Sequence, residues 1–150
     1  MSLIEKGVEI SVPVTVAYNQ WTQFEEFPRF MNGVEQVTQL DTTHLKWKAN
    51  IGGKTEEWTA EITEQVPDER IAWKSLDGTQ NAGVVTFHRL SDTRSKVMLQ
   101  LQYEPHGMVE NVGEAIGVVS NRVESDLERF KTYIEARGKE TGGWRGTVKH

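Results

Sequence analysis

The 150-residue sequence predicts an α+β domain in which a curved, seven-stranded antiparallel sheet wraps around one long C-terminal helix, with two short helices after the first strand. Up to Pro105, apolar side chains recur mainly at every second residue, the period of a half-buried strand. After Pro105 they recur every three or four residues, the period of an amphipathic helix. The loops between successive strand segments are short and favour an antiparallel meander, because parallel pairs need long crossovers.

The N-terminal elements follow from alternation and from two prolines. Apolar and polar residues alternate over 8–12, which predicts the first strand. Pro13 ends this strand, and its fixed φ suits the first turn of a short helix, which we expect over 14–22. The apolar segment 25–31 is interrupted by Pro28 and therefore predicts a second, short or broken helical turn.

Six further strands are expected, each bounded by residues that favour turns. They are centred on 34–40, 45–51, 57–63, 71–74, 83–88 and 97–103. The pairs Gly52–Gly53, Pro67–Asp68 and Asp77–Gly78 fall between these segments, and a Gly-Gly pair suits a tight hairpin. The sheet is therefore expected to be a meander.

The long helix is predicted from Met108 to about Arg137. Its apolar stripe is unbroken and consists of Val109, Val112, Ile116, Val119, Val123, Leu127, Phe130 and Ile134. About thirty residues at ~1.5 Å each make a rod of ~45 Å, long enough to cross a small sheet. Gly138 is expected to cap its C-terminus. We therefore expect a single domain over 1–138 and a polar, glycine-rich, flexible tail over 139–150.

Composition and charge exclude several classes of function. A net charge of −5 argues against nucleic acid as a partner and disfavours anionic membrane surfaces. No apolar run approaches the ~20 residues that span a bilayer, so stable membrane insertion is not expected. The first ten residues carry charges where a secretory signal needs an apolar core, and the chain has no cysteine. We expect a cytoplasmic protein; its oligomeric state is not predictable.

Aromatic residues gather on one predicted face of the sheet. If each strand turns its apolar side chains toward the long helix, that face carries Trp47, Trp58, Trp73, Phe87 and Tyr103. Each aromatic covers about 150–250 Å² when buried. Two interpretations stay open at this point: the wall of a pocket for a planar or apolar ligand, and a core filled by its own tryptophans.

The first half of the long helix has few bulky side chains. Gly113 and Gly117 together cost ~2 kcal/mol relative to alanine, unless something gains from the missing side chains. Close contact between helix backbone and sheet is one explanation, and open volume beneath the helix is the other. We favour a cavity under Gly113 to Ser120, closed at its far end by the bulky half from Leu127 to Ile134. The expected lining residues are Trp47, Trp58, Trp73, Phe87, Tyr103, Gly113, Ile116, Gly117 and Ser120.

The sequence has no recognisable catalytic or metal-binding motif. Its four histidines show none of the usual ligand spacings, and no nucleophile elbow or phosphate-binding loop is present. Ser120 and Asp126 lie on the long helix without a recognisable base. Arg122 either reaches inward to a carbonyl or acidic group of a ligand or extends to the surface. We expect no metal and no cofactor, and catalytic residues remain unknown.

Several short motifs, in the expected order, carry a family resemblance. They are FPRFM at 27–31, VEQV at 34–37, IAWKS at 71–75, GVVTF at 83–87, YEP-x-G at 103–107 and DLERFK at 126–131. Over about residues 3–137 the chain resembles the polyketide cyclase/dehydrase branch of the START-like (SRPBCC) superfamily. That resemblance implies a helix-grip fold with a hydrophobic cavity between the sheet and the long helix. No residue matches a catalytic motif of the family.

Three functions remain candidates. The first is a carrier or sensor that binds a small lipophilic molecule, such as a lipid, quinone or polyketide-like compound, with Tyr103, Ser120 and tryptophan N–H groups as polar partners. The second is a cyclase or dehydrase-type enzyme in the same cavity, which would need an inward acid or base. The third is a protein-interaction module, which would show a closed core and a large exposed apolar patch.

Overall fold

The computed structural model of the chain describes residues 2–51, 53–78, 80–104 and 112–149, with side chains over the same ranges except at 2, 51, 104 and 112–116. The elements in chain order are β1 (Ser2–Ile10), α1 (Val14–Trp21), the 3₁₀ helix η1 (Phe24–Arg29), β2 (Val34–Gln39), β3 (His44–Ile51), β4 (Lys54–Val66), β5 (Arg70–Ser75), β6 (Gln80–Ser91), β7 (Arg94–Glu104) and α2 (Val112–Arg137). The predicted order of strands and helices is confirmed.

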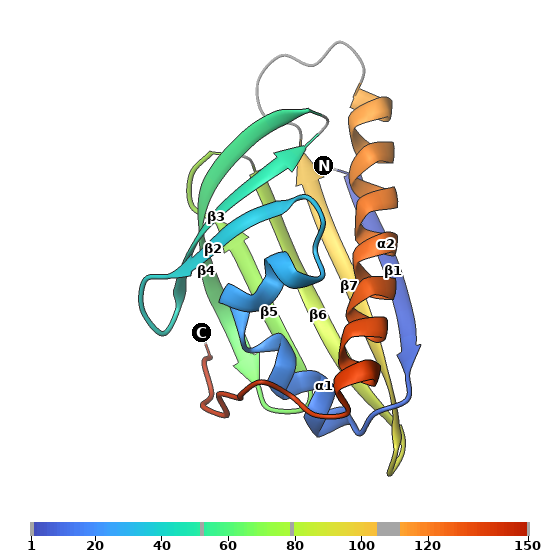
Figure 1. The fold of residues 1–150 in the computed structure, drawn as a ribbon. Helices are drawn as coiled ribbons and strands as arrows, with labels where there is room; N and C mark the ends of the chain where they lie inside the picture. The colour runs from blue at the N-terminus through green and yellow to red at the C-terminus, as the bar shows by residue number, and fades with distance from the viewer. Residues whose placement is uncertain (1, 52, 79, 105–111, 150) are drawn as a thin grey trace.

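The seven strands form one antiparallel sheet in the order β1-β7-β6-β5-β4-β3-β2. Strands β2 to β7 are a meander, and β1 pairs with β7 so that the sheet wraps beside α2 (Figure 1). Register shifts interrupt three ladders, between Val34 and Gln36, between Ile62 and Glu64, and between Arg89 and Ser91. Such irregularities increase local twist and bend a strand, which suits a sheet that wraps around a helix.

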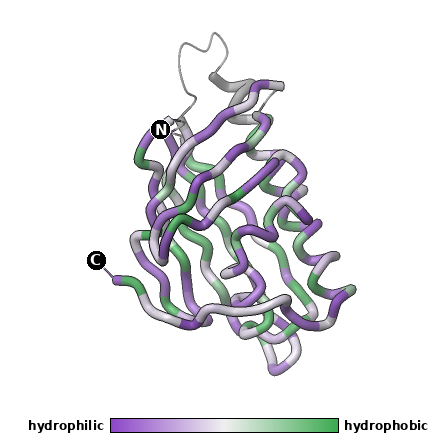
Figure 2. Tube along the Cα trace, turned by 60° about the vertical axis from the view of Figure 1, so that its left-hand side comes forward, coloured by the Kyte–Doolittle hydropathy of each residue, from purple (hydrophilic) through white to green (hydrophobic). Residues whose placement is uncertain are grey.

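Alternating side chains decide which face of the sheet is buried. Hydrophobic and hydrophilic residues alternate along the strands in Figure 2. In β6, for example, Val85 and Phe87 are buried whereas His88 is exposed. The concave face therefore carries the core, and the charged residues of the convex face lie in solvent.

Helix α2 runs across the concave side of the sheet, as Figure 1 shows. Its second half is fully packed, with Leu127, Phe130 and Ile134 all at most 2% exposed. The helix ends at Arg137, as predicted, and Gly138 adopts φ 73° while its N–H donates to the Ile134 carbonyl at 2.9 Å. This is the αL cap that glycine favours. The predicted start at Met108 falls on residues outside the described ranges.

Aromatic rings close the end of the domain near α1. Trp21 of α1 makes edge-on contact with Phe130 of α2 at 5.0 Å between ring centroids and with Phe27 of η1 at 5.5 Å. Phe30 contacts Phe130 at 5.1 Å. Edge-to-face pairs of this kind add about 0.5–1.5 kcal/mol each beyond area burial. The bulky half of α2 is thus anchored in an aromatic cluster.

The segment after α2 packs against the domain, whereas its composition predicts a flexible tail. The N–H of Thr141 donates to Gln20 Oε1 at 2.8 Å, and the N–H of Trp144 donates to Thr22 Oγ1 at 3.0 Å. Val148 and Gln65 of β4 exchange two backbone hydrogen bonds of 2.8 and 2.9 Å. The side chains of Gln20 in α1 and of Thr22 just after it, together with the backbone of β4 at Gln65, therefore satisfy polar backbone groups of this segment. Figure 1 shows the segment crossing the end of the domain that holds α1.

Candidate ligand-binding site

A cavity of about 170 Å³ lies between the sheet and the middle of α2. One water molecule needs roughly 10–15 Å³ of such space, so the volume fits a small organic molecule. The lining residues are mostly apolar and come from the sheet, η1, the loop before β2, α1 and α2: Trp21, Phe27, Met31, Gly33, Val34, Trp47, Ala49, Asn50, Trp58, Trp73, Asn81, Leu99, Leu101, Tyr103, Val118, Val119, Arg122, Val123 and Asp126.

One wall of the cavity is a pair of stacked indoles. Trp47 of β3 and Trp58 of β4 are direct cross-strand partners, and their rings are nearly parallel, with an angle of 6° and centroids 5.8 Å apart. Phe27 of η1 extends this wall, with its ring 5.6 Å from that of Trp47. The Nε1 atom of Trp47 is buried and has no hydrogen-bond partner among the described residues. The indoles of Trp47 and Trp58 therefore present a planar apolar surface to the cavity.

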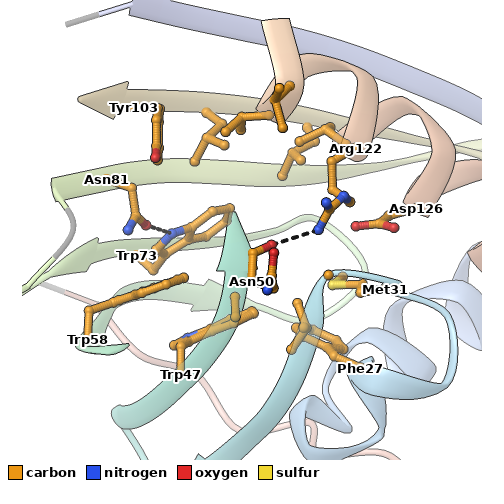
Figure 3. Close-up of a pocket in the computed structure, with 18 of the residues that line it drawn as sticks. Phe27, Met31, Trp47, Asn50, Trp58, Trp73, Asn81, Tyr103, Arg122 and Asp126 are labelled. Atoms are coloured by element: carbon orange, nitrogen blue, oxygen red, sulfur yellow. Dashed lines mark hydrogen bonds between the residues drawn. The ribbon is translucent and has the colours of Figure 1, made fainter. Parts of the chain in front are cut away.

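Trp73 supplies the adjoining wall and is held by its neighbours on β6. Its indole lies over Gly83, its cross-strand partner, where a Cβ atom would come 2.8 Å from the ring. The indole N–H donates to Asn81 Oδ1 at 3.1 Å, and the Asn81 N–H donates to Ser75 Oγ at 3.0 Å. Gly83 thus leaves room for the ring, and Asn81 fixes its orientation. The orientation of Trp73 is visible in Figure 3.

Arg122 brings a positive charge to the opposite side of the cavity. It extends from α2 across Gly33, where a Cβ atom would lie 1.4 Å from the guanidinium Nη1. That Nη1 donates to the Asn50 carbonyl at 2.9 Å (Figure 3). The Arg122 side chain therefore points inward, which is one of the two orientations that the sequence left open.

Asp126 lines the cavity one helical turn after Arg122. Its Oδ1 accepts hydrogen bonds from the Asn32 N–H and from Arg129, both at 3.1 Å. Its side chain is only 13% exposed. Burial raises the pKa of Asp126 from 3.8 to about 6, against the opposing effects of the Asn32 N–H, Arg129 and Arg122. The carboxyl can therefore exchange a proton near neutral pH.

Tyr103 of β7 provides a polar group at the other side of the cavity. Figure 3 shows it beside Asn81, away from Arg122 and Asp126. Burial raises the pKa of the Tyr103 phenol, and the charge of Glu56 adds to the effect. The phenol therefore stays protonated at neutral pH and is available as a hydrogen-bond donor.

The structure gathers four of the residues that the sequence proposes as cavity lining, namely Trp47, Trp58, Trp73 and Tyr103. Phe87 lies in the aromatic core instead, 5.2 Å from the ring of Tyr18, and does not line the cavity. Alternation predicts the face on which Phe87 lies but not its position along the curved sheet.

The part of α2 that lines the cavity differs from the part predicted from its glycines. Gly117 and Ser120 are half-buried and do not line the cavity. A Cβ atom at Gly117 would meet nothing within 4 Å, so close contact with the sheet does not explain that glycine. The side chains of Gly113 and Ile116 lie outside the described part. From residue 117 onward, the helix lines the cavity at 118–126, and the centre of this stretch lies about one and a half turns beyond the centre of the predicted 113–120.

Asp126 is the acidic residue of the site, and the sequence analysis names it on the long helix without placing it in the cavity. It carries no motif, yet it lies seven residues after Val119 and four after Arg122, all on one stripe of α2. A polar pair at that spacing beside an apolar stripe is the signal that could have identified it. Across the described ranges, no group of three or more acidic or histidine side chains could hold a metal ion. Within the same ranges, no helix is long and apolar enough to cross a bilayer.

Comparisons with known proteins agree with this architecture. An uncharacterised 17.2 kDa protein of Streptomyces lincolnensis is 54% identical over 149 residues, which cover 99% of each chain. The Zhui aromatase/cyclase from Streptomyces sp. R1128 superposes with a TM-score of 0.77 at 16% identity, over 95% of this chain and 99% of that one. A START superfamily protein from Mycobacterium smegmatis has a TM-score of 0.69 at 14% identity, over 85% and 97%.

The family assignment comes from the sequence as well as the fold. Residues 10–132 match the family described as "Polyketide cyclase / dehydrase and lipid transport", a span that includes β2 to β7, α1, η1 and most of α2. At identities below 20%, the two solved structures establish the fold alone. The chain therefore belongs to the polyketide cyclase/dehydrase and lipid transport family and has its helix-grip fold.

Proposed function

We propose that the protein binds a small lipophilic molecule in the cavity between the sheet and α2, as a carrier or a sensor. The observation that supports this function is the cavity itself, about 170 Å³ with walls formed largely by Trp47, Trp58, Trp73 and aliphatic side chains. Protein interiors are normally close-packed, and voids larger than a water molecule are few. A ligand that fills this space would gain the dispersion contacts and apolar burial that the walls otherwise lack.

The indole surfaces favour a ligand with a flat apolar body. Trp47 and Trp58 present parallel rings, and Trp73 is fixed by Asn81, so the wall is formed before a ligand arrives. Small-molecule sites usually combine such walls with a few polar groups that fix orientation. Here those groups are the Tyr103 hydroxyl and Arg122.

Native mass spectrometry of protein purified from its own host tests this function. We expect a co-purifying small molecule, and a rise in melting temperature with at least one compound from a panel of lipids, quinones and polyketides. Ala49→Phe should abolish both effects, because Ala49 is 5% exposed and lines the cavity. Ala72→Phe is the matched control, since Ala72 is adjacent to Trp73 on β5 and points to the opposite face. Empty protein with no thermal shift would contradict the proposal.

An enzyme of the cyclase or dehydrase type is the second candidate, and Asp126 is the observation in its favour. A carboxyl with a pKa of about 6 beside Arg122 can take or give a proton at neutral pH, as general acid–base chemistry requires. Incubation with a poly-β-ketone analogue, followed by product analysis, separates the two functions. Turnover of the analogue by the natural protein, and loss of that turnover in Asp126→Asn, would favour the enzyme. If the natural protein and the variant both bind the analogue and release it chemically unchanged, the carrier is favoured.

The third candidate function, a protein-interaction module, has less support than the other two. The large exposed apolar residues in the described ranges belong to separate segments: Leu3 on β1, Leu40 after β2, Leu76 after β5, Leu90 on β6 and Trp144 after α2. Isolated apolar residues on a surface are common and need no partner to explain them. The cytoplasmic location stays a prediction from the composition.

A further inference from the structure

Arg122 is a cation in a cavity whose walls are otherwise mainly apolar. Its position is fixed by the Nη1 bond to the Asn50 carbonyl and by the space over Gly33. A guanidinium has five N–H donors, and this is the one hydrogen bond that the described residues make with it. Most of its donor capacity is therefore unused on the protein side.

The charge of Arg122 has no direct counter-ion among the described residues. No described carboxylate oxygen lies within 4.0 Å of its nitrogen atoms. Asp126 is the nearest candidate, but its bonded oxygen is occupied by the Asn32 N–H and Arg129. Asp126 interacts with Arg122 only through space, without a direct contact, so a ligand carboxylate or enolate would be the first anionic group in hydrogen-bond contact with the guanidinium.

The geometry points to the chemical class of the ligand. Resting on the proposed binding function, we propose that the ligand is amphipathic: a planar apolar body against Trp47, Trp58 and Trp73, with a carboxylate or enolate oxygen bound by Arg122. A planar guanidinium matches the two oxygens of a carboxylate or of an enolised β-dicarbonyl, which a point-like ammonium does not. Figure 3 shows the indoles and the guanidinium on facing sides of one space.

The opposite side of the cavity limits where such a charge can lie. Tyr103 and Asn81 are neutral there, and the Asn81 Oδ1 already accepts from Trp73. A negatively charged group placed against Trp58 would be desolvated without a cation. The ligand is thus oriented with its oxygen group toward α2 and its apolar body along β3, β4 and β5.

Two probes of equal shape test this inference: naphthalene-2-carboxylate and the neutral naphthalene-2-carboxamide. Their dissociation constants are measured at pH 8 by calorimetry, with tryptophan fluorescence as a second readout. We expect the natural protein to bind the carboxylate about tenfold more tightly than the amide, which corresponds to about 1.4 kcal/mol. Arg122→Gln should remove this preference while leaving the amide affinity within about threefold.

Two further variants separate a local contact from net charge. Gly33→Ala keeps the arginine but places a Cβ atom 1.4 Å from Nη1, so the guanidinium must move and the preference should fall. Arg137→Gln removes the same charge from the exposed end of α2, outside the cavity, and should leave the preference intact. Thermal unfolding of each variant verifies that it is folded.

The outcomes distinguish this inference from the function on which it rests. Equal affinities for both probes, unchanged by Arg122→Gln but abolished by Ala49→Phe, would overturn the anionic group and leave the binding function standing. Failure of both probes to bind the natural protein would overturn this inference alone if a compound of the lipid, quinone and polyketide panel still raises the melting temperature, and would overturn both if none does. A preference that is lost equally in Arg137→Gln would mean that long-range charge, not contact with Arg122, produces it.

Discussion

Replacing Asp126 by Asn should make the protein more stable, and the gain should depend on pH. The carboxyl is 13% exposed, and its folded pKa of about 6 lies above the value of 3.8 for an exposed aspartate. At 1.36 kcal/mol per pKa unit, this difference corresponds to roughly 3 kcal/mol. Well below pH 3.8 the carboxyl is protonated in both the folded and the unfolded chain, so it costs nothing there. As the pH rises from about 4 to 6, only the unfolded chain ionises freely, and the natural protein loses stability.

Urea denaturation at pH 4 and pH 7.5, followed by circular dichroism, measures this effect. The difference in free energy of unfolding, Asp126→Asn minus natural protein, should be about 2.4 kcal/mol larger at pH 7.5 than at pH 4. Asparagine retains an acceptor for the Asn32 N–H, so that hydrogen bond survives at both pH values. Asp92→Asn is the control, because that carboxylate is 89% exposed. A difference for Asp126→Asn that does not change with pH would refute the burial argument.

Three other substitutions test the packing that surrounds the cavity. Phe130→Ala should lower the free energy of unfolding by about 3–5 kcal/mol, since the ring is fully buried; a loss under 1 kcal/mol in urea denaturation would contradict this. Gly138→Ala should cost about 1 kcal/mol because φ is 73°, and an unchanged melting temperature would argue against the αL cap. Val148→Asp should expose the segment after α2, measured as faster tryptic cleavage at Arg145; equal rates would mean that the segment is not held by β4.

The sequence predicts α2 well because burial of one whole helix face requires apolar residues at every third or fourth position, and α2 has them without a break. The strands are predicted in the right order, and all but β2 are predicted too short. In β1, the half-buried Lys6 lies at an inward position between Ile4 and Val8 and pairs with Glu124 of α2. A charged residue there breaks the alternation, so the predicted strand begins at Val8, whereas the observed strand begins at Ser2.

Long-range contacts account for most of what the sequence does not reveal. The register shift between Ile62 and Glu64 reverses the buried side of β4, so that Gln65 is buried near its end. The segment after α2 depends on Gln20 and Thr22, more than 100 residues away, and no local pattern indicates that pairing.

The sequence predicts a cavity with an aromatic wall, but not which part of α2 lines it. Tryptophans at alternating positions indicate an aromatic wall, and Trp47, Trp58 and Trp73 do line one. The helix side of the site could not be derived from residue size alone, because the polar pair Arg122 and Asp126 marks it rather than the glycines. The raised pKa of Asp126 arises from burial, which depends on the packed fold and not on any neighbour in the sequence.

A crystal structure of the protein with naphthalene-2-carboxylate would test the central claim most directly. We predict the naphthalene ring against Trp47 and Trp73, with a carboxylate oxygen within hydrogen-bond distance of the Arg122 guanidinium. A cavity filled by water alone at saturating ligand, or a ring bound elsewhere on the surface, would contradict the account.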